Sequence, residues 1–236
     1  MVDRLSTQRL RGGDAMTIQV LVTDDHKVVR RGLRGFLELD PELEVVGEAS
    51  NGAEAMDMAR LLEPDVVLMD LLMPVMDGIE ATREIRKELP EVEVVALTSV
   101  LEDAVVTGAI KAGAIGYLLK TTEAHELCEA IKAAAAGQVR IAPEAAARLI
   151  REVRTPESPE ALAEPLTERE TEVLKLIARG KANKQIASEM FVAMSTVKTH
   201  VNKLYRKLGV TSRTQAALYA VRIGLVPTEE LGEESR

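Results

Sequence analysis

The sequence predicts an α/β domain with a parallel five-stranded sheet, followed by a small all-α domain. Over the first half of the chain, short runs rich in Val, Ile and Leu alternate with segments of helical periodicity, which is typical of a parallel sheet covered on both faces. After residue 165 the pattern is purely helical. The charge also changes there: residues 166–227 hold eleven Lys or Arg against four Glu, while the rest holds 19 basic against 34 acidic residues. The net charge of −8 therefore conceals a basic module of the kind that binds nucleic acid.

The five predicted strands are short and almost continuously apolar, as expected of strands buried on both faces. They comprise residues 18–25, 44–49, 65–70, 92–99 and 116–120. Helices are expected between them at residues 27–40, 51–64, 78–90 and 101–114, and a fifth helix at 122–136 closes the domain. Pro64 and Pro90 mark the ends of two of these helices, since proline cannot continue a helix.

Composition sets the expected domain boundaries. Residues 1–15 are polar and rich in Gly and Arg, which predicts a disordered N-terminal extension before an α/β domain at 16–137. Residues 138–165 are expected to form a linker, with a short helix from Ile141 and then a solvated Pro-rich segment. The all-α domain is expected at 166–227, before an acidic tail at 228–236. Its helices are expected to begin with hydroxyl or amide N-caps at Thr167, Asn183, Ser195 and Ser212.

Two further features bear on the compartment. No apolar run approaches the roughly 20 residues that span a bilayer, so we expect no membrane segment. The single Cys128 cannot form an internal disulfide and fits a reducing cytoplasm. The sequence therefore predicts a cytoplasmic protein.

Polar residues follow four of the predicted strands. Asp24 and Asp25 end the first strand, Asp70 the third, Thr98 the fourth and Lys120 the fifth. Ligands bind at this carboxyl edge in parallel α/β sheets. Three adjacent carboxylates need a cation, and oxygen ligands without Cys or His favour Mg²⁺. Lys120 and Thr98 suit phosphoryl oxygens, which makes Asp70 a candidate nucleophile. The alternative is that the acids cap loops and Lys120 merely neutralises them.

Residues 183–210 describe a helix-turn-helix, a short helix followed by a tight turn and a longer basic helix. Apolar residues are expected to bury the turn, namely Met190, Phe191, Val192 and Met194. A second apolar set recurs at three- and four-residue spacing and predicts the buried stripe of the longer helix: Val197, Val201, Leu204 and Leu208.

The opposite side of the longer helix is expected to enter a DNA major groove through Lys198, Thr199, Asn202 and Lys203, which can reach base edges. Ser195 and Thr196, at the helix N-terminus, suit phosphates. Contacts that position the DNA backbone are expected from Lys184, Arg206, Lys207 and Arg213. The alternative is a solvated basic face on a small bundle. Aromatic residues are only 2% of the chain, which disfavours stacking on single strands and favours double-stranded DNA.

The segments VTDDH, VVLMDLLMPVMDG, ALTS and GAIGYLLK, in this order, closely resemble the receiver domain of two-component response regulators of the NarL/FixJ family, over about residues 17–137. The resemblance implies a flavodoxin-like (βα)5 receiver in which Asp70 accepts a phosphoryl group from a sensor histidine kinase. It also implies that Asp24, Asp25, Asp70 and the Leu72 carbonyl hold Mg²⁺. Lys120 would pair with the phosphate, Thr98 would bind it and shift, and Tyr117 would reorient with Thr98.

Residues 166–226, from LTERETEVLKLIARG through STVKTHVNKLYRKLGV, closely resemble the LuxR-type DNA-binding domain that accompanies such receivers. Together the two resemblances imply a transcription regulator that is switched by phosphorylation and binds promoter DNA. A homodimer is expected in the phosphorylated or DNA-bound state, and RNA polymerase is a candidate further partner.

Two rival functions come from other classes. A Mg²⁺-dependent phosphohydrolase would use similar acids, but such enzymes place the nucleophile in an Asp-x-Asp pattern after the first strand, whereas Asp70 ends the third. A phosphorylation-independent DNA binder with a vestigial receiver would not need the complete set of pocket residues found here. The chain is therefore not expected to be a turnover enzyme, although slow self-dephosphorylation is compatible with it.

Overall fold

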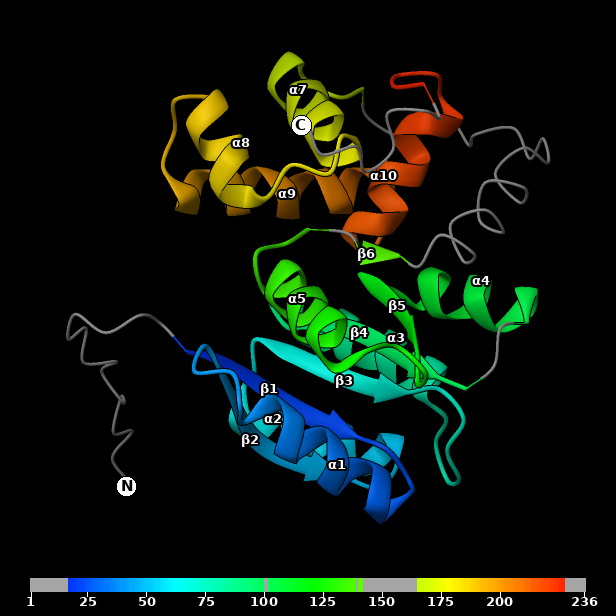
Figure 1. Ribbon diagram of the computed structural model, residues 1–236. Helices are drawn as coiled ribbons and strands as arrows, with labels where there is room; N and C mark the ends of the chain where they lie inside the picture. The colour runs from blue at the N-terminus through cyan, green and yellow to red at the C-terminus, as the bar shows by residue number, and fades with distance from the viewer. Residues whose placement is uncertain (1–16, 100–101, 139, 142–164, 228–236) are drawn as a thin grey trace, which may run out of the picture.

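The computed structural model describes residues 17–99, 102–138, 140–141 and 165–227, which form a sheet domain and a helical domain in contact with each other (Figure 1). The expected N-terminal extension, the linker helix with its Pro-rich segment and the acidic tail lie outside the described residues. Among the described residues, no helix combines the length and the apolar character that crossing a membrane requires.

The sheet domain contains one parallel sheet in the strand order β2-β1-β3-β4-β5-β6. Its strands are β1 (Ile18–Thr23), β2 (Leu43–Ala49), β3 (Val66–Asp70), β4 (Glu93–Thr98), β5 (Gly116–Leu119) and β6 (Arg140–Ile141). The predicted five-stranded parallel sheet is confirmed, and β6 adds a short edge strand. The expected helix start at Ile141 is wrong, because Arg140 and Ile141 pair with Gly116 and Tyr117 of β5. Two residues carry too little periodicity to reveal a strand.

Helices cover both faces of the sheet. They are α1 (Lys27–Leu37), α2 (Gly52–Leu62), α3 (Gly78–Glu88), α4 (Asp103–Ala112) and α5 (Ala124–Ala135). Alternate residues of the central strands pack on α1 and α5 in one cluster and on α2 and α3 in another, and α4 packs with Ala96 and Tyr117. All five residues of β3 are buried, and full burial of a Val or Leu side chain contributes about 1.5–3 kcal/mol. This burial fixes the strand that ends in Asp70.

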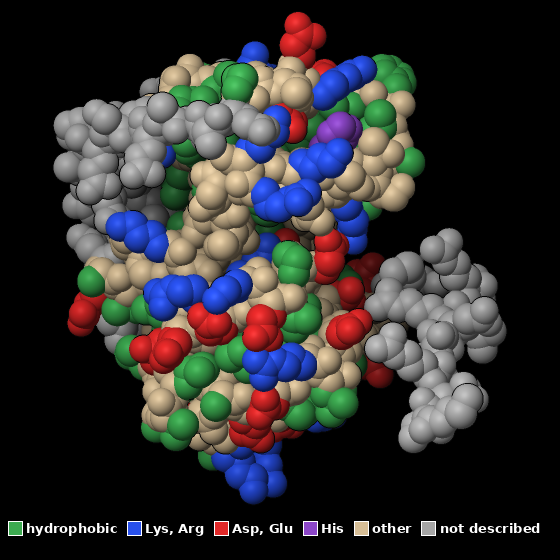
Figure 2. Space-filling view, turned by 180° about the vertical axis from the view of Figure 1, so that it is seen from behind, with side chains coloured by type: hydrophobic (Ala, Val, Ile, Leu, Met, Phe, Trp, Pro, Cys, Tyr) green, Lys and Arg blue, Asp and Glu red, His purple; other side chains and the backbone are tan. Residues whose placement is uncertain are grey.

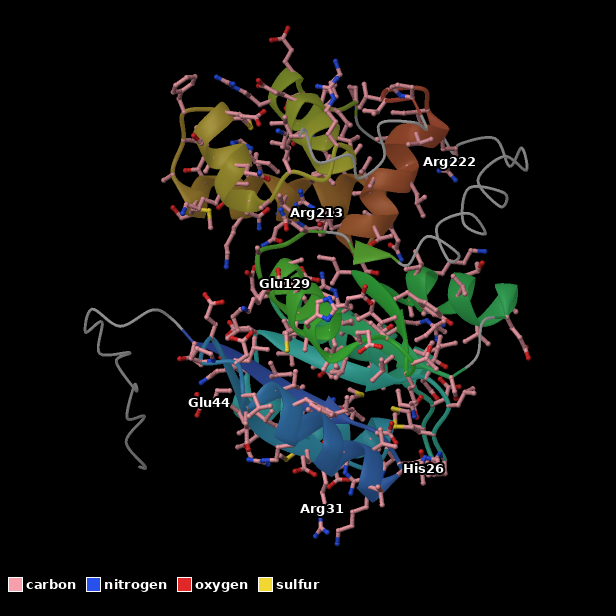
Figure 3. All side chains as sticks on the ribbon, viewed as in Figure 1. His26, Arg31, Glu44, Glu129, Arg213 and Arg222 are labelled. Atoms are coloured by element: carbon pink, nitrogen blue, oxygen red, sulfur yellow. The ribbon has the colours of Figure 1, made fainter. Side chains whose placement is uncertain are left out.

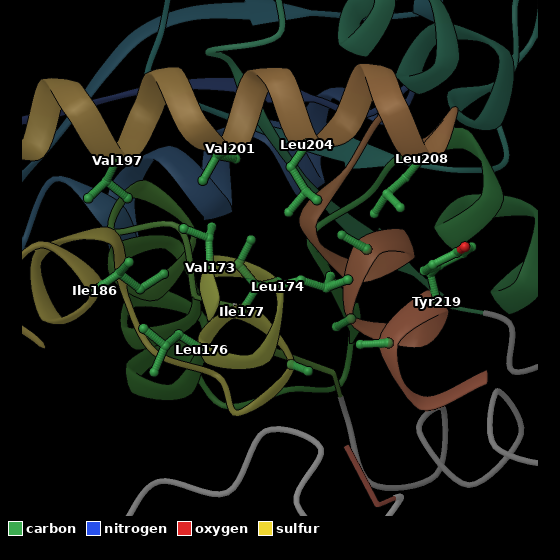
Figure 4. Packing of buried hydrophobic residues seen from close by; sticks show 14 of the residues in the cluster. Val173, Leu174, Leu176, Ile177, Ile186, Val197, Val201, Leu204, Leu208 and Tyr219 are labelled. Atoms are coloured by element: carbon green, nitrogen blue, oxygen red, sulfur yellow. The ribbon is translucent and has the colours of Figure 1, made fainter. Parts of the chain in front are cut away.

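The helical domain consists of α7 (Glu168–Ala178), α8 (Asn183–Glu189), α9 (Met194–Leu208) and α10 (Arg213–Arg222). The predicted apolar stripe of α9 is buried against Val173, Leu174 and Ile177 of α7 and against α8 and α10 (Figure 4). The side chains of this stripe, Val197, Val201, Leu204 and Leu208, are each at most 9% exposed. One face of α9 therefore belongs to the core, which leaves the other face for binding.

The predicted N-caps are half correct. Thr167 accepts a hydrogen bond from the Glu170 N–H in a reciprocal capping box, and Ser212 accepts one from the Gln215 N–H. Asn183 and Ser195 are not caps, because α8 and α9 begin after Ala182 and Ala193. At Ala182 the Gln185 side chain accepts the backbone N–H at 2.7 Å. The Ala182 N–H at the start of α8 is thus hydrogen-bonded although Ala182 has no capping side chain. The residue types that usually mark a helix start are therefore missing from the sequence at this position.

The turn between α8 and α9 is only partly buried. Met190 is buried, as expected, but Phe191 is 95% exposed and Met194 is 44% exposed, so their expected burial is wrong. Phe191 has a left-handed backbone with φ of 56°. This conformation turns the chain sharply between the helices and directs one bulky side chain out of the bundle.

The two domains meet along α9 and α10. Gln215 of α10 donates through Nε2 to the carbonyl oxygens of Ile110 and Lys111, at 3.2 and 2.6 Å. These carbonyls belong to the last turn of α4, where the Ile110 carbonyl also accepts the Gly113 N–H at 3.0 Å. Leu218 of α10 packs against the buried cluster around α4. The helical domain therefore caps and covers the end of α4.

Candidate functional sites

The predicted pocket residues lie together at the carboxyl edge of the sheet. Strands β1 and β3 are neighbours at the point where the strand order reverses, so Asp24 and Asp70 face the same crevice. The Lys120 ammonium, just after β5, lies 2.6 Å from Asp24 Oδ2 and 2.7 Å from Asp70 Oδ2. One cation thus bridges two carboxylates from different strands, as proximity of the strand ends led us to expect.

Burial sets the electrostatics of this pocket. The side chains of Asp24 and Asp70 are 1% and 4% exposed. Burial raises the pKa of the Asp70 carboxyl, although the hydrogen bond from Lys120 opposes this shift. Burial also lowers the pKa of Lys120, but its hydrogen bonds to Asp24 and Asp70 outweigh burial and raise its pKa overall. Lys120 therefore stays charged, and the two carboxylates depend on it for neutralisation.

Asp25 extends the acidic group towards solvent. Its Oδ1 lies 2.7 Å from His26 Nδ1, and Asp24 Oδ1 accepts the His26 backbone N–H at 2.8 Å. Lys120 Nζ contacts Asp24 Oδ2 and the His26 ring nitrogen contacts Asp25 Oδ1, and neither oxygen has a further donor among the described residues. These are hard oxygen ligands of the kind that Mg²⁺ prefers, so the donor set fits that ion. Arg30, which sequence reasoning missed, donates to the Asp24 carbonyl at 2.6 Å.

The loop after Asp70 holds the carboxylate in place. The Leu72 N–H donates to Asp70 Oδ1 at 3.3 Å, and the Gly78 N–H donates to the Leu71 carbonyl at 3.0 Å. Asp77 caps α3 by accepting the Glu80 N–H at 2.8 Å. Val75 has φ of 72°, a strained conformation for a β-branched residue.

Thr98 and Tyr117 lie beside the pocket in the interior of the domain. Both side chains are fully buried, Thr98 at the end of β4 and Tyr117 within β5. Burial raises the pKa of the Tyr117 hydroxyl to about 12. Tyr117 packs with Val106 and Ile110 of α4, the helix that Gln215 caps from the other domain. Tyr117 thus packs in one cluster with α4 and with Leu71, the residue that follows Asp70.

The predicted DNA-contacting residues of α8 and α9 are distributed unevenly. Lys184, Ser195, Thr199, Lys203 and Arg206 are exposed, and Lys and Arg side chains spread over the helical domain in Figure 2. Thr196 is half-buried, and the Thr199 hydroxyl donates to the Ser195 carbonyl at 2.9 Å. Lys207 forms an ion pair with Glu170 of α7 at 2.8 Å, which ties it to the bundle.

The prediction that Arg213 contacts the DNA backbone is wrong for this arrangement. Its side chain is 1% exposed and donates to Asn183 Oδ1 at 3.2 Å and to the Lys181 carbonyl. Figure 3 shows Arg213 at the junction of the two domains. The sequence places Arg213 in the first turn of a basic-rich helix, and no periodicity signal marks a buried guanidinium there.

Two of the predicted groove-reading residues contact the sheet domain. Lys198 Nζ lies 3.1 Å from Glu91 Oε2, and Asn202 Nδ2 donates to Glu91 Oε1 at 3.2 Å. Glu91 lies in the loop between α3 and β4, and α9 runs along the boundary of the two domains (Figure 1). Sequence reasoning missed Glu91, because it is one of many surface acids until the fold brings α9 beside it.

Comparisons with known proteins agree with the division of the chain into two domains. Residues 20–132 match the response regulator receiver domain, and residues 164–220 match the luxR family of bacterial regulatory proteins. The chain is 48% identical over 209 residues to the transcriptional regulatory protein LiaR of Bacillus subtilis, covering 89% of this chain and 99% of LiaR. It is 44% identical over 211 residues to the response regulator VraR of Staphylococcus aureus, covering 89% of this chain and all of VraR. The crystal structure of ChrA, a response regulator of a heme-sensing two-component system, has 37% identity and a TM-score of 0.50 over 89% of this chain and 99% of that one.

Proposed function

Because this chain belongs to the two-component response regulators that join a receiver domain to a LuxR-type DNA-binding domain, we propose that Asp70 is the residue whose phosphorylation switches it. The observation that carries the proposal is the Lys120 ammonium between Asp24 and Asp70, within 2.7 Å of both. A buried carboxylate beside a fixed cation is placed both to attack phosphorus and to keep the product neutralised.

The transfer itself uses few groups of this chain. An Asp70 carboxylate oxygen attacks the phosphorus of a phosphohistidine, the P–O bond forms, and the P–N bond breaks with its electron pair going to the imidazole of the kinase. Lys120 then pairs with a phosphoryl oxygen, and the Thr98 hydroxyl donates to another. Asp24, Asp25, Asp70 and the Leu72 carbonyl would hold Mg²⁺, which offsets the phosphate charge when bound. Once Lys120 pairs with the phosphoryl group, Asp24 would need a bound Mg²⁺ to neutralise it in place of Lys120.

We assign the switch to the packed path from Thr98 through Tyr117 to α4. Movement of Thr98 towards a phosphoryl group opens space beside β4, and Tyr117 packs on α4 in the same cluster. The last carbonyls of α4 accept hydrogen bonds from Gln215, so a shift of α4 strains the contact with α10. Phosphorylation then favours separation of the domains by biasing a two-state element.

Separation would release the DNA-binding surface. Lys198 and Asn202 bind Glu91 in the closed arrangement, so the same side chains cannot read base edges at that moment. We propose that the freed α9 enters the major groove of promoter DNA, with Lys198, Thr199, Asn202 and Lys203 at the bases. Ser195, Thr196, Lys184 and Arg206 would contact phosphates. A homodimer on two half-sites, a sensor histidine kinase as phosphodonor and a cytoplasmic location complete the proposal, and contact with RNA polymerase stays a prediction.

Phosphotransfer to variants tests this function directly. The wild type and Asp70→Ala are incubated with Mg²⁺ and a small phosphodonor such as acetyl phosphate, and phosphate on the protein is measured by mass spectrometry. Asp57→Asn, an exposed acid on α2, is the control. We expect one phosphoryl group on the wild type and the control and none on Asp70→Ala. Genome-wide DNA binding in strains carrying these forms should fall only with Asp70→Ala.

Two outcomes would contradict the proposal. Equal DNA occupancy by the wild type and Asp70→Ala would show that DNA binding does not depend on phosphorylation. The receiver would then be vestigial. Steady release of phosphate from a phosphomonoester over many turnovers would instead point to a phosphohydrolase, and not to a switch that is phosphorylated once.

A further inference from the structure

Arg30, in the first turn of α1, reaches from the helix to the loop that carries Asp24 and Asp25. Its Nη1 donates to the Asp24 carbonyl at 2.6 Å. That carbonyl is part of the peptide group that joins Asp24 to Asp25. A peptide group is planar, so a donor that fixes its oxygen also fixes the directions in which the chain leaves towards both residues. Arg30 therefore holds the backbone from which two candidate metal-binding carboxylates project.

The Arg30 guanidinium is itself held by a second element. Its Nε lies 3.5 Å from Glu48 Oε2 on β2, and its side chain is only 13% exposed. Arg34, one turn further along α1, also pairs with Glu48, at 3.0 Å, but its other hydrogen bonds go to Glu38 and to the Val45 carbonyl. Arg30 thus joins α1, β2 and the end of β1, whereas the contacts of Arg34 join α1 and β2.

Three further contacts fix Asp24. Its N–H donates to the Ala49 carbonyl at 3.2 Å, its Oδ1 accepts the His26 N–H at 2.8 Å, and Lys120 Nζ lies 2.6 Å from its Oδ2. Lys120 would leave Asp24 to pair with a phosphoryl group, whereas Arg30 contacts the backbone and has no need to move. Arg30 can therefore keep the two carboxylates oriented both before and after phosphoryl transfer.

We propose that Arg30 is a positioning residue of the metal site: it orients the Asp24–Asp25 peptide group so that both carboxylates converge on Mg²⁺. Arg30 touches neither the ion nor the phosphoryl group. Removing a group that orients metal ligands typically costs roughly 10–100-fold in metal affinity. This inference rests on the proposed function, which places Mg²⁺ between these acids. The alternative is that Arg30 only attaches α1 to the sheet.

The sign of the effect separates positioning from charge. Arg30 carries a positive charge close to two carboxylates, so its loss would by charge alone strengthen the binding of a divalent cation. Loss of ligand orientation would instead weaken that binding. A lower metal affinity in a variant without Arg30 is therefore opposite in direction to a charge effect.

Mn²⁺ is a suitable probe, because it prefers the same oxygen ligands as Mg²⁺ and free Mn²⁺ can be measured by electron paramagnetic resonance. It is titrated into the full chain without a phosphodonor. Arg30→Met should bind Mn²⁺ at least about tenfold more weakly than the wild type. Arg34→Met loses the same charge and the same Glu48 partner, and it should bind like the wild type. Equal or tighter binding by Arg30→Met would overturn the proposal.

The Mg²⁺ dependence of phosphorylation by acetyl phosphate gives a second measurement. Arg30→Met should need at least about tenfold more Mg²⁺ for its half-maximal rate, yet reach the wild-type rate at saturation, because Arg30 does not contact the phosphoryl group. A lower maximal rate with an unchanged Mg²⁺ requirement would make Arg30 a merely structural residue and overturn the proposal.

Arg30→Lys decides the matter if Arg30→Met fails to fold, because it keeps the charge and most of the side chain. A single ammonium cannot span the Asp24 carbonyl and Glu48 as the guanidinium fork does, so Mn²⁺ should bind at least about threefold more weakly. Wild-type affinity in Arg30→Lys would then overturn the proposal. A wild type that takes no phosphoryl group on Asp70 would refute the proposed function, whereas unchanged Mn²⁺ affinity in the Arg30 variants refutes only the role of Arg30.

Discussion

Gly78 shows how closely the backbone packs around the candidate phosphorylation site. A Cβ atom built on Gly78 would lie 2.0 Å from the carbonyl oxygen of Asp70 and 2.8 Å from the Leu71 Cα. The start of α3 at Gly78 agrees with the helix that the sequence predicts at residues 78–90. The contact with Asp70 could not be predicted, since it depends on how the loop returns to the end of β3. Single residues near the site thus carry constraints that motif spacing does not reveal.

The residue-scale prediction follows from this contact. Gly78→Ala should destabilise the sheet domain by about 3 kcal/mol, because a rigid backbone, and not a movable side chain, occupies the space. Gly32→Ala on α1 is the matched control, since a Cβ there meets nothing within 4 Å. The control should stabilise the domain by about 0.5–1 kcal/mol through helix propensity. Urea unfolding followed by circular dichroism compares the stabilities of Gly78→Ala and Gly32→Ala. Equal unfolding midpoints would show that the loop after Asp70 moves to accommodate the added Cβ atom, which would contradict the prediction.

Among the elements, those with long periodic patterns were the most predictable. The buried stripe of α9 and the apolar run of β3 were evident because burial on one face or on both imposes a period. The turn of the helix-turn-helix was less predictable. The apolar residues of this turn suggested that it is buried, yet the Phe191 side chain points outward because the backbone there is left-handed. Element ends at Ala182 and Ala193 escaped notice because neither residue caps through a side chain.

The element-scale prediction concerns the capping box of α7. Glu170 accepts hydrogen bonds from Lys207 Nζ at 2.8 Å and from the Thr167 N–H at 2.9 Å. These two hydrogen bonds hold the pKa of the Glu170 carboxyl below its ordinary value, and the bond from Lys207 has the larger effect. A carboxyl whose pKa is lower in the folded state stabilises the fold above its unfolded pKa, and this stabilisation is lost as the pH falls through the folded pKa.

Hydrogen exchange of the α7 amides, corrected for intrinsic rates, should therefore show protection that declines as the pH falls below the ordinary Glu range of about 4–4.5. Glu170→Gln keeps an acceptor for the cap but has no charge, so its protection should be lower at neutral pH and nearly independent of pH. Glu172→Gln, an exposed neighbour that pairs with Arg169, should follow the wild type. A pH dependence that persists in Glu170→Gln would assign it to other groups.

At the scale of the whole molecule, the sequence predicted what each domain contains but not how the domains meet. Asp24, Asp70 and Lys120 could be grouped because parallel strands end at one edge. The interface could not, since Arg86 and Glu91 acquire their roles only through contacts with Thr211 and Asn202, more than a hundred residues away in the sequence. Arg213 illustrates the limit: a basic residue in a basic domain was assigned to DNA, and the fold buries it instead.

The closed arrangement leads to a prediction about DNA affinity before any phosphorylation. Glu91 holds Lys198 and Asn202 of α9, and both members of the ion pair are more than half exposed. An exposed pair of this kind contributes at most about 1 kcal/mol. Glu91→Gln should therefore shift the closed equilibrium modestly and raise the affinity of the unphosphorylated protein for promoter DNA by up to about fivefold. Fluorescence anisotropy with a duplex identified by the genome-wide binding experiment measures this change.

Charge alone could also raise the affinity, because Glu91→Gln removes one negative charge from a protein that binds a polyanion. Glu44→Gln controls for this effect: it makes the same change on β2, far from the domain junction (Figure 3). Only the increase of Glu91→Gln over Glu44→Gln reports release of α9. After phosphorylation the two variants should bind equally well, because the domains are then already apart. If Glu91→Gln kept its advantage in the phosphorylated protein, Glu91 would be repelling DNA directly and would not be holding α9 against the receiver.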